Sequence, residues 1–159
     1  TAEFLFSHPV SRRRIITEKL VRIMLQILIL NAVCILTALA SAAVIGEEFR
    51  IEEFLLLHLA YLLLQAETVS ICFCLSAFLR RSGIGIGLEL AAILYFLNII
   101  ANITEAAQWL KYITPFGYAE AADIITNSRI DPVPAAIGGA VTLAGIAAAF
   151  FKYCSKDIY

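Results

Sequence analysis

Glu67 has the most informative surroundings of any reactive residue in the sequence, because it lies in the middle of a long apolar stretch, residues 54–78. A carboxyl group at that depth in a membrane must face protein or water rather than lipid. The residues at i−7, i+3, i+7 and i+10 are all small: Ala60, Ser70, Cys74 and Ala77. This stripe predicts that Glu67 faces the interior of a helix bundle. It could line a transport path or gate there, or form a structural hydrogen bond, for example to Asn31.

The other reactive groups are more typical of membrane packing than of catalysis. Glu52 and Glu53, followed by His58, lack the His-Glu-x-x-His spacing of a zinc protease. The glycines at 83, 85 and 87 open an apolar stretch, where they favour close helix packing over phosphate binding. The sequence contains no Gly-x-x-x-x-Gly-Lys-Ser/Thr motif. We therefore expect no catalytic residue, metal or cofactor in this chain.

The elements that must position Glu67 are membrane-spanning helices. The chain is 61% hydrophobic with a mean hydropathy of +0.86, whereas soluble domains are about 45–50% apolar. A membrane span needs about 20 mostly apolar residues. Four stretches qualify, approximately residues 20–45, 54–78, 84–103 and 133–151. The sequence predicts an all-α, polytopic membrane helix bundle, with residues 15–159 as its transmembrane domain.

The charged residues predict how these spans are oriented. One set of span ends holds nine of the twelve basic residues: Arg12, Arg13, Arg14, Lys19, Arg22, Arg80, Arg81, Lys152 and Lys156. The opposite ends hold the other three basic residues and eight acids: Glu47, Glu48, Glu52, Glu53, Glu105, Glu120, Asp123 and Asp131. Because basic loops stay in the cytosol, we expect both ends of the chain to be cytosolic. The net charge of −1 gives no indication of a nucleic-acid partner.

Residues 104–131, which we call the outer segment, are predicted to form more than a simple loop. Two short amphipathic stretches flank a break that a Pro-Gly signal predicts, and its residues are Thr114, Pro115, Phe116 and Gly117. Trp109, Tyr112 and Tyr118 are of the types that collect at the membrane interface. We expect a hairpin of two short re-entrant or interfacial helices before the last span.

The N-terminal segment, residues 1–14, carries an apolar patch on the cytosolic side. Phe4, Leu5 and Phe6 precede Pro9 and three consecutive arginines. This pattern is typical of a helix on the membrane surface, but it also suits a cytosolic helix presented to a partner protein.

Three stretches resemble one family of membrane proteins. Glu3-Phe-Leu-Phe-Ser-His-Pro-Val-Ser-Arg-Arg-Arg-Ile-Ile is similar to the cytosolic coupling segment of ABC type 2 permeases, the exporter class of bacterial ABC transporters. Trp109-Leu-Lys-Tyr-Ile-Thr-Pro-Phe-Gly-Tyr resembles the segment before the last span of such permeases. Phe151-Lys-Tyr-Cys-Ser-Lys-Asp-Ile-Tyr is similar to their common ending. The resemblance covers essentially the whole chain. Since these permeases usually have six spans, it implies two further spans before Thr1.

The resemblance also implies a function and partners. Two permease copies or halves would pair with two cytosolic ATPase subunits in a bacterial plasma membrane. ATP would bind the partner ATPase subunit rather than this chain. The ATPase-coupling residues would be Glu3, Phe4, Leu5, Phe6 and Pro9. The alternative is a membrane scaffold or sensor subunit that transports nothing, and the sequence does not specify a substrate.

Overall fold

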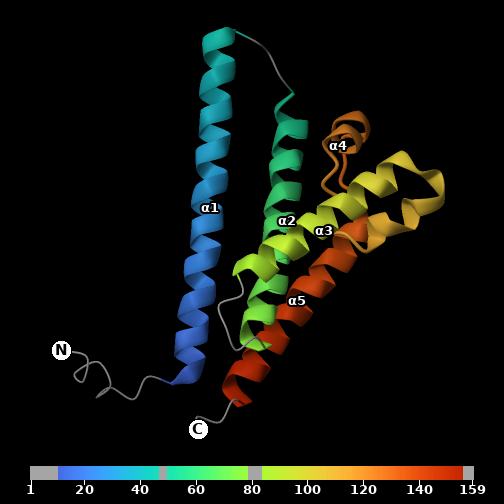
Figure 1. Cartoon of the computed structure of the whole chain (residues 1–159). Helices are drawn as coiled ribbons and strands as arrows, with labels where there is room; N and C mark the ends of the chain where they lie inside the picture. The colour runs from blue at the N-terminus through green and yellow to red at the C-terminus, as the bar shows by residue number, and fades with distance from the viewer. Residues whose placement is uncertain (1–10, 47–49, 79–83, 156–159) are drawn as a thin grey trace.

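The fold is a bundle of helices, seen in a computed structural model that describes residues 11–46, 50–78 and 84–155 (Figure 1). These described residues contain no strand. The helices are α1 (Arg12–Ile45), α2 (Ile51–Phe78), α3 (Ile84–Ile103), η2 (Glu105–Tyr112), α4 (Ala121–Asn127) and α5 (Pro132–Ser155). The predicted all-α membrane fold is therefore confirmed.

Four of these helices, α1, α2, α3 and α5, are long and apolar enough to cross a membrane. The largest difference from the sequence-based bounds is at α1, which begins at Arg12 rather than near residue 20. The side chain of Ser11 caps the helix by accepting a hydrogen bond from the Arg14 amide at 3.4 Å. Arg12 to Arg14 therefore form the first turn of α1. A helix of 34 residues is about 51 Å long, so it extends well beyond a hydrocarbon core of about 30 Å.

The helices alternate in direction, as four successive spans must. The start of α1 and the end of α5 lie at the same end of the molecule (Figure 1). Two cation–π contacts tie the helices together at this end. The Lys19 ammonium lies 5.7 Å from the centre of the Tyr153 ring, and the Lys152 ammonium lies 5.5 Å from that of Phe78.

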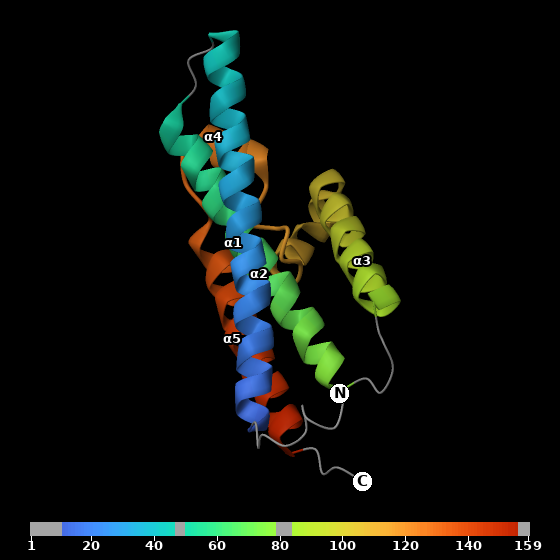
Figure 2. The ribbon, with the colours of Figure 1, turned by 90° about the vertical axis from the view of Figure 1, so that its left-hand side faces the viewer.

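The outer segment lies toward the opposite end of the bundle, around the start of α5. It joins α3, which packs mainly on η2 and stands apart from the other long helices in Figure 2. The most extensive helix–helix contact is between α2 and α5. The arrangement is thus a tight α2–α5 pair with α1 on one side and the outer segment over one end.

Candidate functional site

The α2–α5 interface is built from small residues on both helices. Ser70 on α2 and Ala149 on α5 are completely buried. A Cβ atom on Gly145 would overlap the Ser70 side chain, and one on Gly138 would overlap the Glu67 carboxyl group. Ser70 Oγ donates a hydrogen bond across the interface to the backbone oxygen of Thr142 at 2.8 Å. Such close approach is what small residues allow between helices in a membrane.

Glu67 lies at this interface and faces the interior, as its stripe of small neighbours predicts. Its side chain is only 4% exposed. The hydroxyl of Tyr118, which is also 4% exposed, donates a hydrogen bond to Glu67 Oε2 at 3.0 Å. The pair therefore joins the middle of α2 to the outer segment, and Gly138 of α5 leaves room for both side chains.

Two sequence-based expectations about this pair are wrong. Asn31 is not the partner of Glu67, because its amide Nδ2 donates instead to Gln65 Oε1 at 2.6 Å and to the Ile27 oxygen at 2.9 Å. Tyr118 does not point outward as an interfacial aromatic would, because the turn before it directs the ring into the core. Burial, and then the neighbouring Glu67 carboxyl group, raise the pKa of the Tyr118 phenol above its ordinary range. The phenol therefore keeps its proton and donates it in the hydrogen bond to Glu67.

The outer segment folds as two short helices with a compact turn between them. The helix η2 ends at Tyr112 and α4 begins at Ala121. Within the predicted break, Thr114, Pro115 and Gly117 are buried. Gly117 lies so close to the Lys111 carbonyl that a Cβ atom there would overlap it. The Phe116 ring is half-buried and packs edge-on against Tyr95 of α3, with ring centroids 5.4 Å apart.

Polar contacts attach the outer segment at its sides. Asn102 of α3 donates to Glu120 Oε2 at 2.8 Å, whereas the pair of Lys111 with Asp123 at 3.5 Å joins η2 to α4 within the outer segment. Ser128 Oγ donates to Glu53 Oε1 at 2.8 Å.

Three residues, Glu52, Glu53 and His58, were compared in the sequence with a zinc-protease motif. In the structure, the last two have other contacts. Glu53 is 4% exposed and also pairs with Arg50 at 2.6 Å. His58 Nδ1 lies 2.9 Å from the oxygen of Phe54 in its own helix. Within residues 11–46, 50–78 and 84–155, no three His, Cys, Asp or Glu side chains are grouped to hold a metal. The carboxyl group of Glu53 serves to hold the outer segment on α2.

A pocket of about 630 Å³ opens above the Glu67–Tyr118 pair. It lies between η2, α4 and the start of α5, and its lining includes Trp109, Lys111, Tyr118, Asp123, Arg129 and Pro134. Sequence reasoning missed this pocket. The available signal was the position of Tyr118 directly after the Thr-Pro-Phe-Gly break, where a chain reversal can bring a side chain inward.

Other predicted residues are not placed together with Glu67. Glu3, Phe4, Leu5, Phe6 and Pro9 lie outside the described residues, as do Arg80 and Arg81. Glu89 is exposed. The part of the candidate site that the structure describes therefore consists of the Glu67–Tyr118 pair, the small residues around it and the pocket above it.

Comparison with known proteins gives the family. A family model described as ABC-2 family transporter protein matches residues 1–158. Neither the curated proteins nor the solved structures compared with this chain gave a match. With nearly every residue covered by that family model, and with an all-α membrane fold, the chain belongs to the ABC-2 family of transporter proteins and is a membrane permease component of an ABC transporter.

Proposed function

We propose that this permease is an exporter component whose outer gate is formed by Glu67 and Tyr118. The observation that carries the proposal is their 3.0 Å hydrogen bond, which joins the middle of α2 to the outer segment. A buried ionisable residue inside a membrane protein marks an ion or substrate path by default. Here Tyr118 lines the pocket, and Glu67 lies at the α2–α5 interface against Gly138.

The energetics suit a gate that opens and closes. A hydrogen bond to a charged group contributes about 1.5–3 kcal/mol, and one between neutral groups about 1 kcal/mol. Either value is small enough for nucleotide binding on a partner subunit to overcome. Gly138 lies against both side chains of the pair, and Tyr118 follows directly on the buried turn at Thr114–Gly117. Separating Tyr118 from Glu67 therefore requires the outer segment to move away from α2.

In this proposal the driving force comes from a separate cytosolic ATPase subunit that binds ATP. Residues Glu3 to Pro9 act as the lever that contacts the ATPase. They lie just ahead of Ser11, which caps α1. The lever is continuous in sequence with a 34-residue helix, so its motion can reach the outer end of the bundle. A second permease copy or half completes the path, and both ends of this chain are cytosolic in a bacterial plasma membrane.

The gate is tested by the reactivity of a cysteine placed behind it. Thr142→Cys is suitable because Thr142 is half-buried beside Ser70, and the contact from Ser70 is to the Thr142 backbone. The full-length permease and its ATPase are reconstituted without native cysteines, and an impermeant thiol reagent is added outside. We expect labelling to be slow at rest and several-fold faster during ATP turnover. Thr126→Cys, at an exposed position outside the pocket lining, should react equally in both states. Unchanged labelling of Thr142→Cys would contradict the gate.

The lever is tested separately by ATPase binding. Phe4→Ala combined with Leu5→Ala removes two apolar side chains, each contributing roughly 1.5–3 kcal/mol when buried. The recovery of ATPase with tagged full-length permease should fall more than tenfold at equal membrane expression, whereas Ser7→Ala should change it little. Equal recovery would leave residues 1–14 as a membrane-surface helix. Absence of any ATPase with the unmutated protein would favour the scaffold or sensor function.

A further inference from the structure

A groove of about 560 Å³ lies at the end of the bundle opposite the outer segment, between the first turn of α1 and the last turns of α5. It is lined by Arg13, Phe150, Phe151 and Cys154. Its walls are thus one guanidinium group, two aromatic rings and a thiol. The groove is far from the Glu67–Tyr118 pair and takes no part in the proposed gate.

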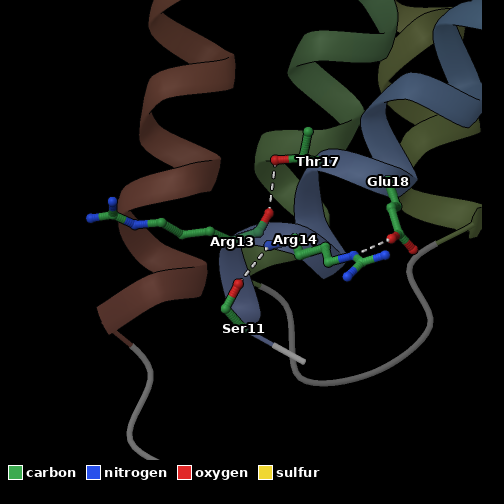
Figure 3. Close-up of polar contacts among 5 residues, drawn as sticks. All are labelled: Ser11, Arg13, Arg14, Thr17 and Glu18. Carbon is green, nitrogen blue, oxygen red and sulfur yellow. Dashed lines mark hydrogen bonds and ion pairs between the residues drawn. The ribbon is translucent and has the colours of Figure 1, made fainter. Parts of the chain in front are cut away.

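Arg13 differs from its neighbour Arg14 in what its side chain contacts. Arg14 Nε pairs with Glu18 Oε1 at 3.0 Å on one side of α1, whereas the Arg13 side chain extends toward α5 (Figure 3). Successive helical residues point about 100° apart, which separates the two guanidinium groups. Among the residues that the structure describes, no carboxylate lies within ion-pair distance of Arg13. Its backbone oxygen accepts from Thr17 Oγ1 at 2.7 Å, which is an ordinary contact within the helix.

The groove has the two properties that a phospholipid requires. A guanidinium group offers a planar set of donors that matches a phosphate. Phe150 and Phe151 belong to the apolar helix α5 and provide a surface along which acyl chains can lie. The position also fits, because α1 passes here from its basic first turn into its apolar length. Basic pockets between membrane helices are known to bind anionic headgroups.

We propose that the groove between the start of α1 and the end of α5 binds an anionic phospholipid, whose phosphate is held by Arg13 and whose acyl chains lie against Phe150 and Phe151. A free phosphate ion would contact the guanidinium group alone, whereas a phospholipid would also contact the aromatic walls. The proposal rests on the groove itself and does not depend on the export direction or on the gate.

Native mass spectrometry of the full-length protein in detergent tests the charge contact. Phosphatidylglycerol is added, and the bound fraction is compared with that of phosphatidylcholine for the unmutated protein, Arg13→Gln and Arg14→Gln. The two variants lose the same charge at adjacent positions, but only Arg13 lines the groove. We expect Arg13→Gln to weaken phosphatidylglycerol binding by about five- to tenfold and Arg14→Gln to weaken it less than twofold. Equal losses in both variants, or no preference for phosphatidylglycerol, would overturn the proposal.

A second measurement needs no change to Arg13. Cys154 is exposed and lines the groove, so a lipid bound there should shield it from a neutral maleimide. In a protein with Cys154 as its one cysteine, labelling should be several-fold slower in phosphatidylglycerol nanodiscs than in phosphatidylcholine nanodiscs. A matched protein with Ser76→Cys, an exposed position in the last turn of α2, should show no such difference. Equal rates for Cys154 in the two lipids, or equal protection by inorganic phosphate alone, would contradict lipid binding in the groove.

Discussion

The α2–α5 pair and α3 are all apolar helices of membrane-spanning length, yet they are held in different ways. In the pair, small residues bring the two backbones together, and Ser70 forms a hydrogen bond to the opposite backbone. In α3, Leu88, Phe96 and Ile103 are largely exposed, and the helix contacts the rest of the chain mainly through η2. Apolar character therefore predicts that a helix enters the membrane, whereas residue size predicts which helix it packs against.

This difference assigns the two regions different mechanical properties. A closely packed interface resists changes of even one methylene group, so the α2–α5 pair should move as one body. Helix α3 is attached through the Tyr95–Phe116 ring contact near its middle and the Asn102–Glu120 hydrogen bond near its end. A movement of the outer segment should therefore carry α3 with it while α2 and α5 stay together.

The largest effect should come from filling the α2–α5 interface. Gly138→Leu places a side chain where Glu67 and Tyr118 already lie. Overpacking of this kind typically costs 1–3 kcal/mol, and sometimes more. The free energy of unfolding, measured in mixed micelles on the full-length protein, should fall by at least about that amount. Gly139→Leu is the matched control, because nothing lies within 4 Å of its added Cβ atom. Similar losses in the two variants would show that the interface is not closely packed.

An intermediate effect is expected where α3 meets the outer segment. Tyr95→Leu removes an edge-on ring pair with Phe116, and such pairs contribute about 0.5–1.5 kcal/mol. The same unfolding measurement should show a loss in that range, with faster amide hydrogen exchange in α3. Leu88→Ala, at a side chain that is 72% exposed, should change stability by less than about 0.5 kcal/mol. If Leu88→Ala is the more damaging change, α3 is held by a surface other than the one described.

The smallest effect should come from the hydrogen bond that Ser70 of α2 donates to α5. Ser70→Ala removes the bond to the Thr142 oxygen, and interhelical hydrogen bonds in membranes average about 0.6 kcal/mol. Ser76→Ala provides the comparison, because Ser76 Oγ bonds to the oxygen of Phe73 in its own helix. A loss of several kcal/mol for Ser70→Ala would mean that the hydrogen bond, rather than close packing, holds the pair.

Much of the fold could be predicted from the sequence because hydropathy and helix breaks are local properties. The four spans, the small-residue stripes around Glu67 and the break at Thr114–Gly117 all follow from residue type and spacing. The structure has four long apolar helices, and η2 and α4 lie on either side of the break, in agreement with those patterns. On α5, Gly138 and Gly145 lie directly against Glu67 and Ser70 of α2.

The partners of individual polar groups could not be predicted in the same way. Asn31 and Glu67 both face the interior, and helical spacing alone made their pairing plausible. The actual pairs depend on the relative heights of α1 and α2 and on how far the turn at Gly117 carries Tyr118 inward. These are properties of the tertiary arrangement. The pocket was missed for the same reason, because η2, α4 and α5 form it together.

The central claim is that Glu67 and Tyr118 act together to close the outer end of the path, and a double-mutant cycle tests it most directly. The rate of labelling of Thr142→Cys at rest is measured for Glu67→Gln, Tyr118→Phe and the combination of both. If the two side chains act only through their mutual hydrogen bond, Tyr118→Phe should speed labelling several-fold. The double variant should then be no faster than the faster single variant, because the shared contact is lost only once. Rates that multiply in the double variant, or resting rates that none of the changes affects, would contradict the claim.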